Sequence, residues 1–151
     1  MVSVGISVFL AFLSLVFMAN ALKILREYER GVVYTLGRYT SSKGPGLVVL
    51  VPGLQQMVRV DLRVRTLDIP SQDVISKDNI SVKVSAVVYF RVVDPERCVN
   101  KVADFMRATY ELSQTTLREV LGKHDLDEML SERDKLSDDV RTLLDSQTDQ
   151  W

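Results

Sequence analysis

Residues 67–95, LDIPSQDVISKDNISVKVSAVVYFRVVDP, carry the clearest pattern in the sequence. Asp73–Ser76 and Ile80–Val92 favour strands, and the polar segment Lys77–Asn79 between them is short enough to close a hairpin. In the second strand the side chains at even positions are apolar, which is typical of one buried face. Its other face is polar at first and more apolar towards the end, so we expect the strand to be covered on both sides there.

The residues before this hairpin also favour strands. Gly31–Gly37 is the first of them. Leu47–Val51 is apolar throughout and lies between two turns, Lys43–Gly46 and Pro52-Gly53. In Met57–Ile69 apolar residues alternate with charged ones, which predicts a continuous strand with one buried face. Together these segments predict a mostly antiparallel sheet.

The last third of the chain favours helices. Asp94 can cap a helix that starts at Pro95, and apolar residues at helical spacing continue to Met106. Gly122 is expected to end a second helix. Asp125–Glu128 then has the spacing of a capping box. The apolar stripe beyond it contains a seven-residue repeat that hints at packing between subunits, but a core-facing helix is the favoured interpretation. The predicted fold class is therefore α+β.

The segment before the sheet has the composition of a membrane anchor. Val2–Leu22 contains no charged residue and, as a helix, covers the roughly 30 Å hydrocarbon core of a bilayer. Basic residues follow it at Lys23, Arg26 and Arg30, whereas none precedes it. We therefore predict a single-pass transmembrane helix over residues 1–22 in the cell (plasma) membrane, with the soluble domain in the cytoplasm.

Two other interpretations concern the same segment. Ala19-Asn20-Ala21 resembles the cleavage site of a signal peptide, but the apolar stretch is longer than a usual signal core and no Lys or Arg precedes it. An uncleaved anchor is therefore favoured. A shallow hairpin that enters and leaves the same leaflet stays open, because the serines in the segment tolerate partial depth.

Charge is unevenly distributed along the chain. The totals, 19 Lys and Arg against 20 Asp and Glu, exclude a strongly basic nucleic-acid-binding protein. Lys23–Arg65 holds eight basic and three acidic residues, whereas Lys123–Trp151 holds four basic and nine acidic ones. The basic part follows the anchor, which suits an anionic lipid surface. The candidate contacts for lipid headgroups are Lys23, Arg26 and Arg30.

Two further candidate sites concern lipid. The apolar segment between the two turns is a candidate for shallow insertion into the headgroup layer, although a buried strand is the favoured interpretation. Cys98 is a candidate for lipidation, and a plain packed or surface thiol is the alternative. The candidate insertion residues are Leu47, Val48, Val49, Leu50 and Val51.

The sequence offers no set of residues for catalysis. His124 is the single histidine, and it is expected to be exposed or to cap a helix rather than to act as a base. One cysteine and one histidine cannot close a zinc site or form an intrachain disulfide. The acidic residues within 125–128 lack the loop of a calcium site. We therefore predict no catalytic, cofactor-binding or metal-binding residues and no enzymatic activity.

Several of these segments resemble the SPFH, or Band 7, domain shared by stomatins, prohibitins and flotillins. The resemblance runs from about Ile24 to Trp151 and is closest to the prokaryotic stomatin-like (slipin) branch. The sequence 67–79 with the strand after it is the most specific part. The other matching segments are GRY at 37–39, GPGL at 44–47, VP at 51–52, LG at 121–122 and LDEMLSERD at 126–134.

The resemblance implies an α+β domain of two subdomains, a membrane-proximal one over 23–70 and a second, incomplete one over 71–151. It implies a scaffold that forms homo-oligomers, organises membrane microdomains and regulates partner membrane proteins such as proteases. A single-copy adaptor for a membrane protease or channel is the alternative, and a hydrolase is disfavoured. Because the family continues past the equivalent of Trp151 with another strand and a coiled coil, we expect this chain to be a truncated domain.

Overall fold

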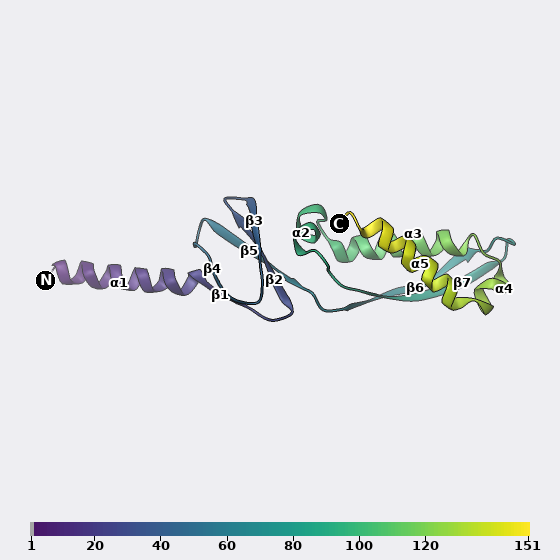
Figure 1. The fold of residues 1–151 in the computed structure, drawn as a ribbon, viewed down its shortest axis with the longest axis horizontal. Helices are drawn as coiled ribbons and strands as arrows, with labels where there is room; N and C mark the ends of the chain where they lie inside the picture. Colours follow the sequence, from purple (N-terminus) through teal and green to yellow (C-terminus); the bar gives the residue numbers. More distant parts are fainter. Residues whose placement is uncertain (1) are drawn as a thin grey trace. The chain divides into compact units, whose positions relative to one another are not determined.

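The computed structural model describes residues 2–151, and the chain forms two compact units. The first unit ends at Arg63 and the second spans Val64–Trp151. This division lies before the subdomain boundary expected after residue 70. The expected subdomains, 23–70 and 71–151, stay a prediction. The apolar N-terminal helix, the antiparallel sheets and the C-terminal helices confirm the predicted α+β class (Figure 1).

The first unit consists of one helix and two small sheets. The helix α1 is followed at once by β1, which pairs with β4 in an antiparallel ladder. The second sheet has the strand order β3-β2-β5 and is also antiparallel. A core of Leu25, Val33, Val48 and Leu50 lies between these strands, with Met57 against it. The bounds are α1 Val2–Ala21, β1 Leu22–Leu25, β2 Glu29–Thr35, β3 Arg38–Lys43, β4 Gly46–Val49 and β5 Gln55–Asp61.

A side chain at Gly31, in the centre of β2, would displace the side chain of Met57. A Cβ atom there would lie 2.4 Å from the sulfur of Met57, which belongs to the neighbouring strand β5. Val32 and Val33 follow and are buried. The predicted first strand is therefore confirmed as β2, and its glycine allows Met57 to reach the core.

The second unit is a long hairpin covered on one face by helices. The strands β6 and β7 form an antiparallel two-stranded sheet, and α3 and α5 lie along it (Figure 1). The hairpin confirms the strongest sequence prediction. The core contains Ile69, Val74, Leu117, Val120, Leu121 and Leu136. The bounds are β6 Arg65–Ile75, β7 Ser81–Phe90, α2 Pro95–Lys101, α3 Phe105–Leu121, α4 Leu126–Ser131 and α5 Arg133–Thr148.

The single strand predicted over Met57–Ile69 was wrong. The structure divides it into β5 and β6, and residues 62–64 connect the two. At this connection the side chain of Asp61 accepts a hydrogen bond of 2.8 Å from the backbone N–H of Arg63, which turns the chain locally. Val64, predicted to share the buried face, is exposed. The alternation of apolar and charged residues therefore continues through the sequence, whereas the hydrogen-bonded strand pairing stops between β5 and β6.

The outer face of β7 also differs from the prediction. Val87 and Tyr89 were expected to be covered, but they are 52% and 71% exposed. The inward-facing residues of the strand, by contrast, pack against the helical core as expected. The apolar end of the outer face is therefore open within the described residues 2–151.

Two helices start where the sequence indicated, α2 at Pro95 and α4 after Asp125, but the first predicted helix is shorter and the last apolar stripe is divided between α4 and α5. Asp94 caps α2 by accepting a hydrogen bond of 3.2 Å from the N–H of Arg97, as predicted. The helix ends at Lys101 rather than running to Met106, because Asp104 caps the new helix α3 through the N–H of Arg107. Leu136 in α5 is buried in the core, which favours the core-facing interpretation of the apolar stripe.

Candidate functional site

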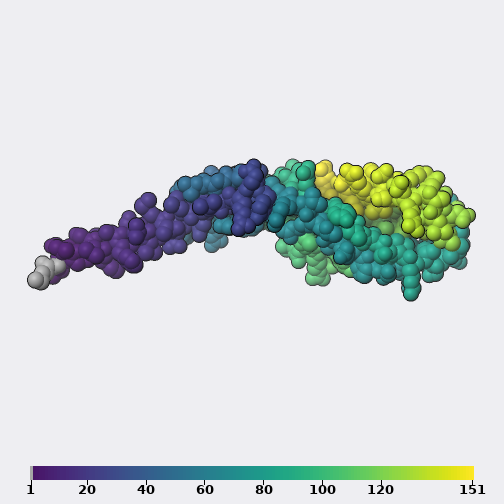
Figure 2. Space-filling view, turned by 90° about the horizontal axis from the view of Figure 1, so that it is seen from below, coloured from purple at the N-terminus to yellow at the C-terminus, as the bar shows by residue number. Residues whose placement is uncertain are grey.

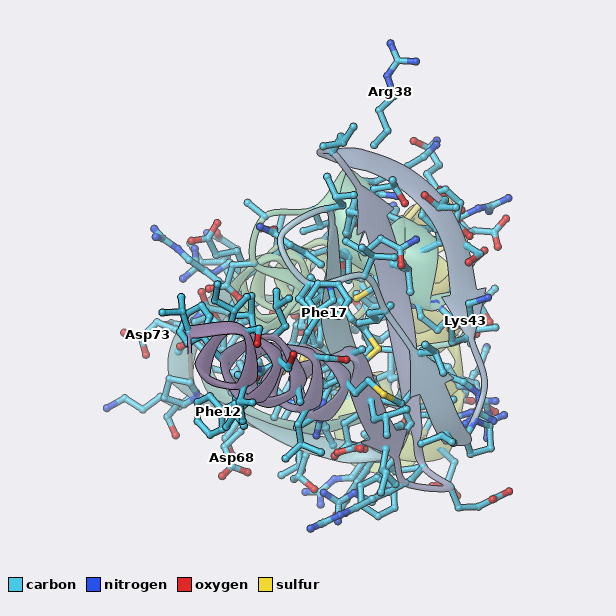
Figure 3. All side chains as sticks on the ribbon, turned by 90° about the vertical axis from the view of Figure 1, so that its left-hand side faces the viewer. Phe12, Phe17, Arg38, Lys43, Asp68 and Asp73 are labelled. Atoms are coloured by element: carbon cyan, nitrogen blue, oxygen red, sulfur yellow. The ribbon has the colours of Figure 1, made fainter. Side chains whose placement is uncertain are left out.

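The helix α1 is exposed along its length. Its residues Val2–Ala21 carry no charge, and only Ala21 is buried. Phe12 and Phe17 project from different sides of the helix (Figure 3), and no other segment lies over it on the face seen in Figure 2. It is long and apolar enough to cross a membrane. A helix that is apolar all round needs lipid or protein around it, and the described residues 2–151 supply no protein cover.

The strands that follow α1 continue this apolar surface. In the β1–β4 ladder Leu22 lies opposite Val49, and Ile24 lies opposite Leu47. The alternate residues Leu25 and Val48 turn into the core instead. The four outward residues form a surface that we name the β1–β4 apolar face. They are Leu22, Ile24, Leu47 and Val49, with exposed fractions of 44%, 69%, 65% and 65%.

A backbone hydrogen bond joins this ladder to the end of the helix. The N–H of Leu50 donates to the carbonyl oxygen of Ala21 across 2.8 Å. Leu50 itself is 5% exposed and packs in the core of the first unit. The apolar surface of α1 and the β1–β4 apolar face therefore belong to elements that are directly bonded to each other.

The five candidate insertion residues do not act as one segment. Leu47, Val49 and Val51 are exposed, whereas Val48 and Leu50 are buried in the core. Only three of the five therefore present exposed side chains for insertion, and shallow insertion stays a prediction. Sequence reasoning missed Ile24, because its pairing with Leu47 is a long-range contact that no local pattern reports.

The three candidate headgroup contacts occupy different environments. Nη1 of Arg26 donates to the hydroxyl of Tyr28 across 2.7 Å. Nη1 of Arg30 donates to the carbonyl oxygens of Glu27 and Glu29, each across 2.8 Å. The ammonium group of Lys23, which lies in β1 beside the end of α1, makes no hydrogen bond or ion pair with any residue in the described range 2–151. Lys23 is half-buried and alternates with the exposed Leu22 and Ile24, and among the three candidates it is the one whose charged group has no partner within that range.

Cys98 lies in the interior of the second unit. Its side chain is buried near a cavity of about 860 Å³ that Phe105 and Trp151 also line. Burial raises the pKa of its thiol, against a smaller lowering by Arg65. Since the thiolate is the reactive form, acylation would require the thiol to leave this environment. Lipidation at Cys98 stays a prediction.

His124 is neither freely exposed nor a helix cap. Its side chain is 21% exposed and contacts two carboxylates, one of which is Glu128 at 2.7 Å. Within residues 2–151 no three potential metal ligands converge. The feature that stands out in the described residues 2–151 is the exposed apolar surface of α1 and the β1–β4 apolar face.

The comparisons with known proteins agree with this arrangement. Residues 23–151 match the SPFH domain / Band 7 family. The chain is 50% identical over 145 residues to a stomatin homolog of Pyrococcus horikoshii. The matched region covers 96% of this chain and 54% of that protein. It is 51% identical over 137 residues to a stomatin homolog of Pyrococcus abyssi, with 91% and 51% covered.

A mammalian relative shows the same match. Stomatin-like protein 3 of Mus musculus is 43% identical over 132 residues, covering 86% of this chain and 46% of that protein. The chain thus spans about half the length of these curated relatives. Because the family match covers residues 23–151, which is all of the second unit and the part of the first unit after α1, the chain belongs to the SPFH domain / Band 7 family.

Proposed function

We propose that this protein is a membrane-anchored scaffold that self-associates into homo-oligomers, organises membrane microdomains and regulates partner membrane proteins such as proteases. Membership of the SPFH domain / Band 7 family supports a membrane-associated scaffold role. The observation that carries the proposal is the apolar surface that passes from α1 into the β1–β4 apolar face. Such a surface exceeds what one transmembrane helix needs, and it holds the first unit against the bilayer.

The proposed topology follows from the charges after the helix. We place the protein as a single-pass protein of the cell membrane, with the strands of the first unit and the whole second unit on the cytoplasmic side. Basic residues follow α1 directly, and the cytoplasmic leaflet carries the anionic lipids that attract them.

The size of the solubilised protein tests the scaffold proposal. Full chain extracted in mild detergent is expected to run as a particle of many copies, because a scaffold gathers partners by presenting its surface repeatedly. Light scattering after size-exclusion chromatography gives the mass directly. A monomer at all concentrations would instead support a single-copy adaptor and would contradict the scaffold.

A charge variant tests the lipid contact of Lys23. Lys23→Gln is expected to reduce the enrichment of anionic lipid around the protein about fivefold, since each basic residue near such a surface contributes about 1 kcal/mol. Energy transfer from labelled protein to labelled anionic lipid in mixed vesicles measures this enrichment.

The matched control for this variant is Lys43→Gln. Lys43 is an exposed lysine at the end of β3 in the same unit (Figure 3), so its loss removes the same charge. Equal loss of enrichment in both variants would show that net charge alone, and not Lys23, recruits the lipid.

A further inference from the structure

The tip of the β6–β7 hairpin is bonded to the junction between α3 and α4. The N–H of Lys77 at the tip donates to the carbonyl oxygen of His124 across 3.0 Å. The carboxylate of Asp78 accepts from the Ser76 hydroxyl and from the backbone N–H of Leu126, and these bonds lower its pKa, the Ser76 bond most strongly. The hairpin therefore fixes the backbone on both sides of His124.

Only half of the predicted capping box forms at this junction. The side chain of Asp125 makes no capping hydrogen bond, so that part of the prediction was wrong. Asp78 of the hairpin serves the first N–H of α4 instead. The other half is present, because the carboxylate of Glu128 accepts from the N–H of Asp125. Glu128 is thereby held beside the imidazole ring.

The ring of His124 lies between carboxylates of two helices. Its Nδ1 is 2.7 Å from Oε2 of Glu128 in α4, and its Nε2 is 3.8 Å from Oδ2 of Asp139 in α5. A neutral imidazole carries one N–H and can donate to only one of these groups. The imidazolium ion donates from both nitrogens and is attracted to both charges.

The packing of α5 makes the second contact consequential. Leu136 is the one buried residue among the 16 residues of α5, and Val140 and Leu143 pack against the same core while partly buried. An added ionic contact at Asp139, one turn further along the helix, therefore acts on a helix that few apolar side chains hold in place. The charged groups that face His124 from the surrounding elements are Lys77 and Asp78 in the hairpin, Lys123 and Asp125 at the junction, Glu128 in α4, and Lys135 and Asp139 in α5.

We propose that His124 links α4 to α5 only when its ring is protonated, and we call this contact the His124 clasp. Protonation of the ring joins α4 to α5 through Glu128 and Asp139, and loss of the proton releases Asp139 while the bond to Glu128 remains. The clasp is an internal conformational device, and it does not depend on the scaffold role or on the membrane contact proposed above.

The pH dependence of the clasp follows from the groups that form it. The contact with Asp139 exists where the ring is protonated, so it is lost when the ring gives up its proton at higher pH. The pKa of Glu128 is lowered, chiefly by its hydrogen bond with His124. The contribution of Glu128 to the stability of the fold is therefore present above its unfolded pKa and is lost as the pH falls through the lowered pKa.

The test compares Asp139→Asn with wild type in detergent-solubilised full chain. Urea unfolding is followed by the fluorescence of Trp151, the only tryptophan, whose backbone N–H donates to the carbonyl oxygen of Thr148 at the end of α5. At pH 5.5 the variant is expected to have an unfolding equilibrium constant about two- to fivefold larger than wild type. At pH 8 the two proteins are expected to agree.

Two further variants decide the outcome. Asp138→Asn removes the neighbouring charge on α5, and it is expected to show no pH-dependent difference from wild type. In a His124→Gln background the effect of Asp139→Asn at pH 5.5 is expected to vanish, because glutamine has no ring that can take up a proton. The proposal is overturned if Asp139→Asn and Asp138→Asn behave alike, or if the Asp139→Asn effect is equally large at pH 8.

Discussion

Two arginines in the middle of α1 are expected to release the protein from membranes into an alkaline carbonate wash. Phe9 and Leu13 lie one turn apart and are 64% and 55% exposed. Each arginine at a helix centre costs about 2.5–3.5 kcal/mol of insertion free energy. Phe9→Arg with Leu13→Arg therefore lowers the insertion equilibrium constant by about ten-thousandfold or more. The wild-type protein is expected to stay entirely in the membrane pellet.

The control for this pair exchanges the same two side chains. Phe9→Leu with Leu13→Phe keeps the composition and length of α1 and is expected to stay membrane-bound. Sedimentation of the washed membranes and immunodetection of both fractions measure the effect. A double-arginine protein that remained in the pellet would show that α1 is not what anchors the chain, as would a mature protein that lacked residues 1–21.

The sequence predicted the elements whose neighbours are close in the chain. The helix α1 and the β6–β7 hairpin need only local patterns, namely an uncharged run and two alternating strands joined by a short turn. The break between β5 and β6 was missed because Val64 continues the alternation while the ladder stops. A strand ends where its partner ends, and the partner of β5 is β2, about 26 residues earlier by the register of Val32 and Val58.

The candidate site divides in the same way. That Leu47–Val51 was apolar could be read directly, but which residues face outward depends on the pairing of β4 with β1. Likewise, Asp125–Glu128 had the spacing of a capping box, yet Asp78 from the hairpin serves the N-terminus of α4. In both places a contact between distant segments overrides a local preference. The same limitation hid the position of His124 between α4 and α5.

A fluorophore at residue 47 is expected to be quenched by brominated lipids several times more strongly than one at residue 40. Leu47→Cys places the label on the β1–β4 apolar face, whereas Thr40→Cys places it on the exposed strand β3 of the same unit. Both variants carry Cys98→Ala, so that only the new thiol reacts. Brominated acyl chains quench only labels that reach them, so the ratio of the two signals reports which surface meets the bilayer.

The free energy behind this contact is comparable to that of the anchor variants. Fully burying an aliphatic side chain contributes about 1.5–3 kcal/mol, and the four residues of the β1–β4 apolar face are on average about 60% exposed, so their transfer contributes about 4–7 kcal/mol. Replacing all four by serine is therefore expected to abolish the quenching at a label on Val51, which is exposed just beyond the ladder. The same variant is also expected to stay in the membrane pellet, because α1 is unchanged. The face is not a membrane contact if residues 47 and 40 are quenched alike, because a freely tumbling unit would expose both labels equally to lipid.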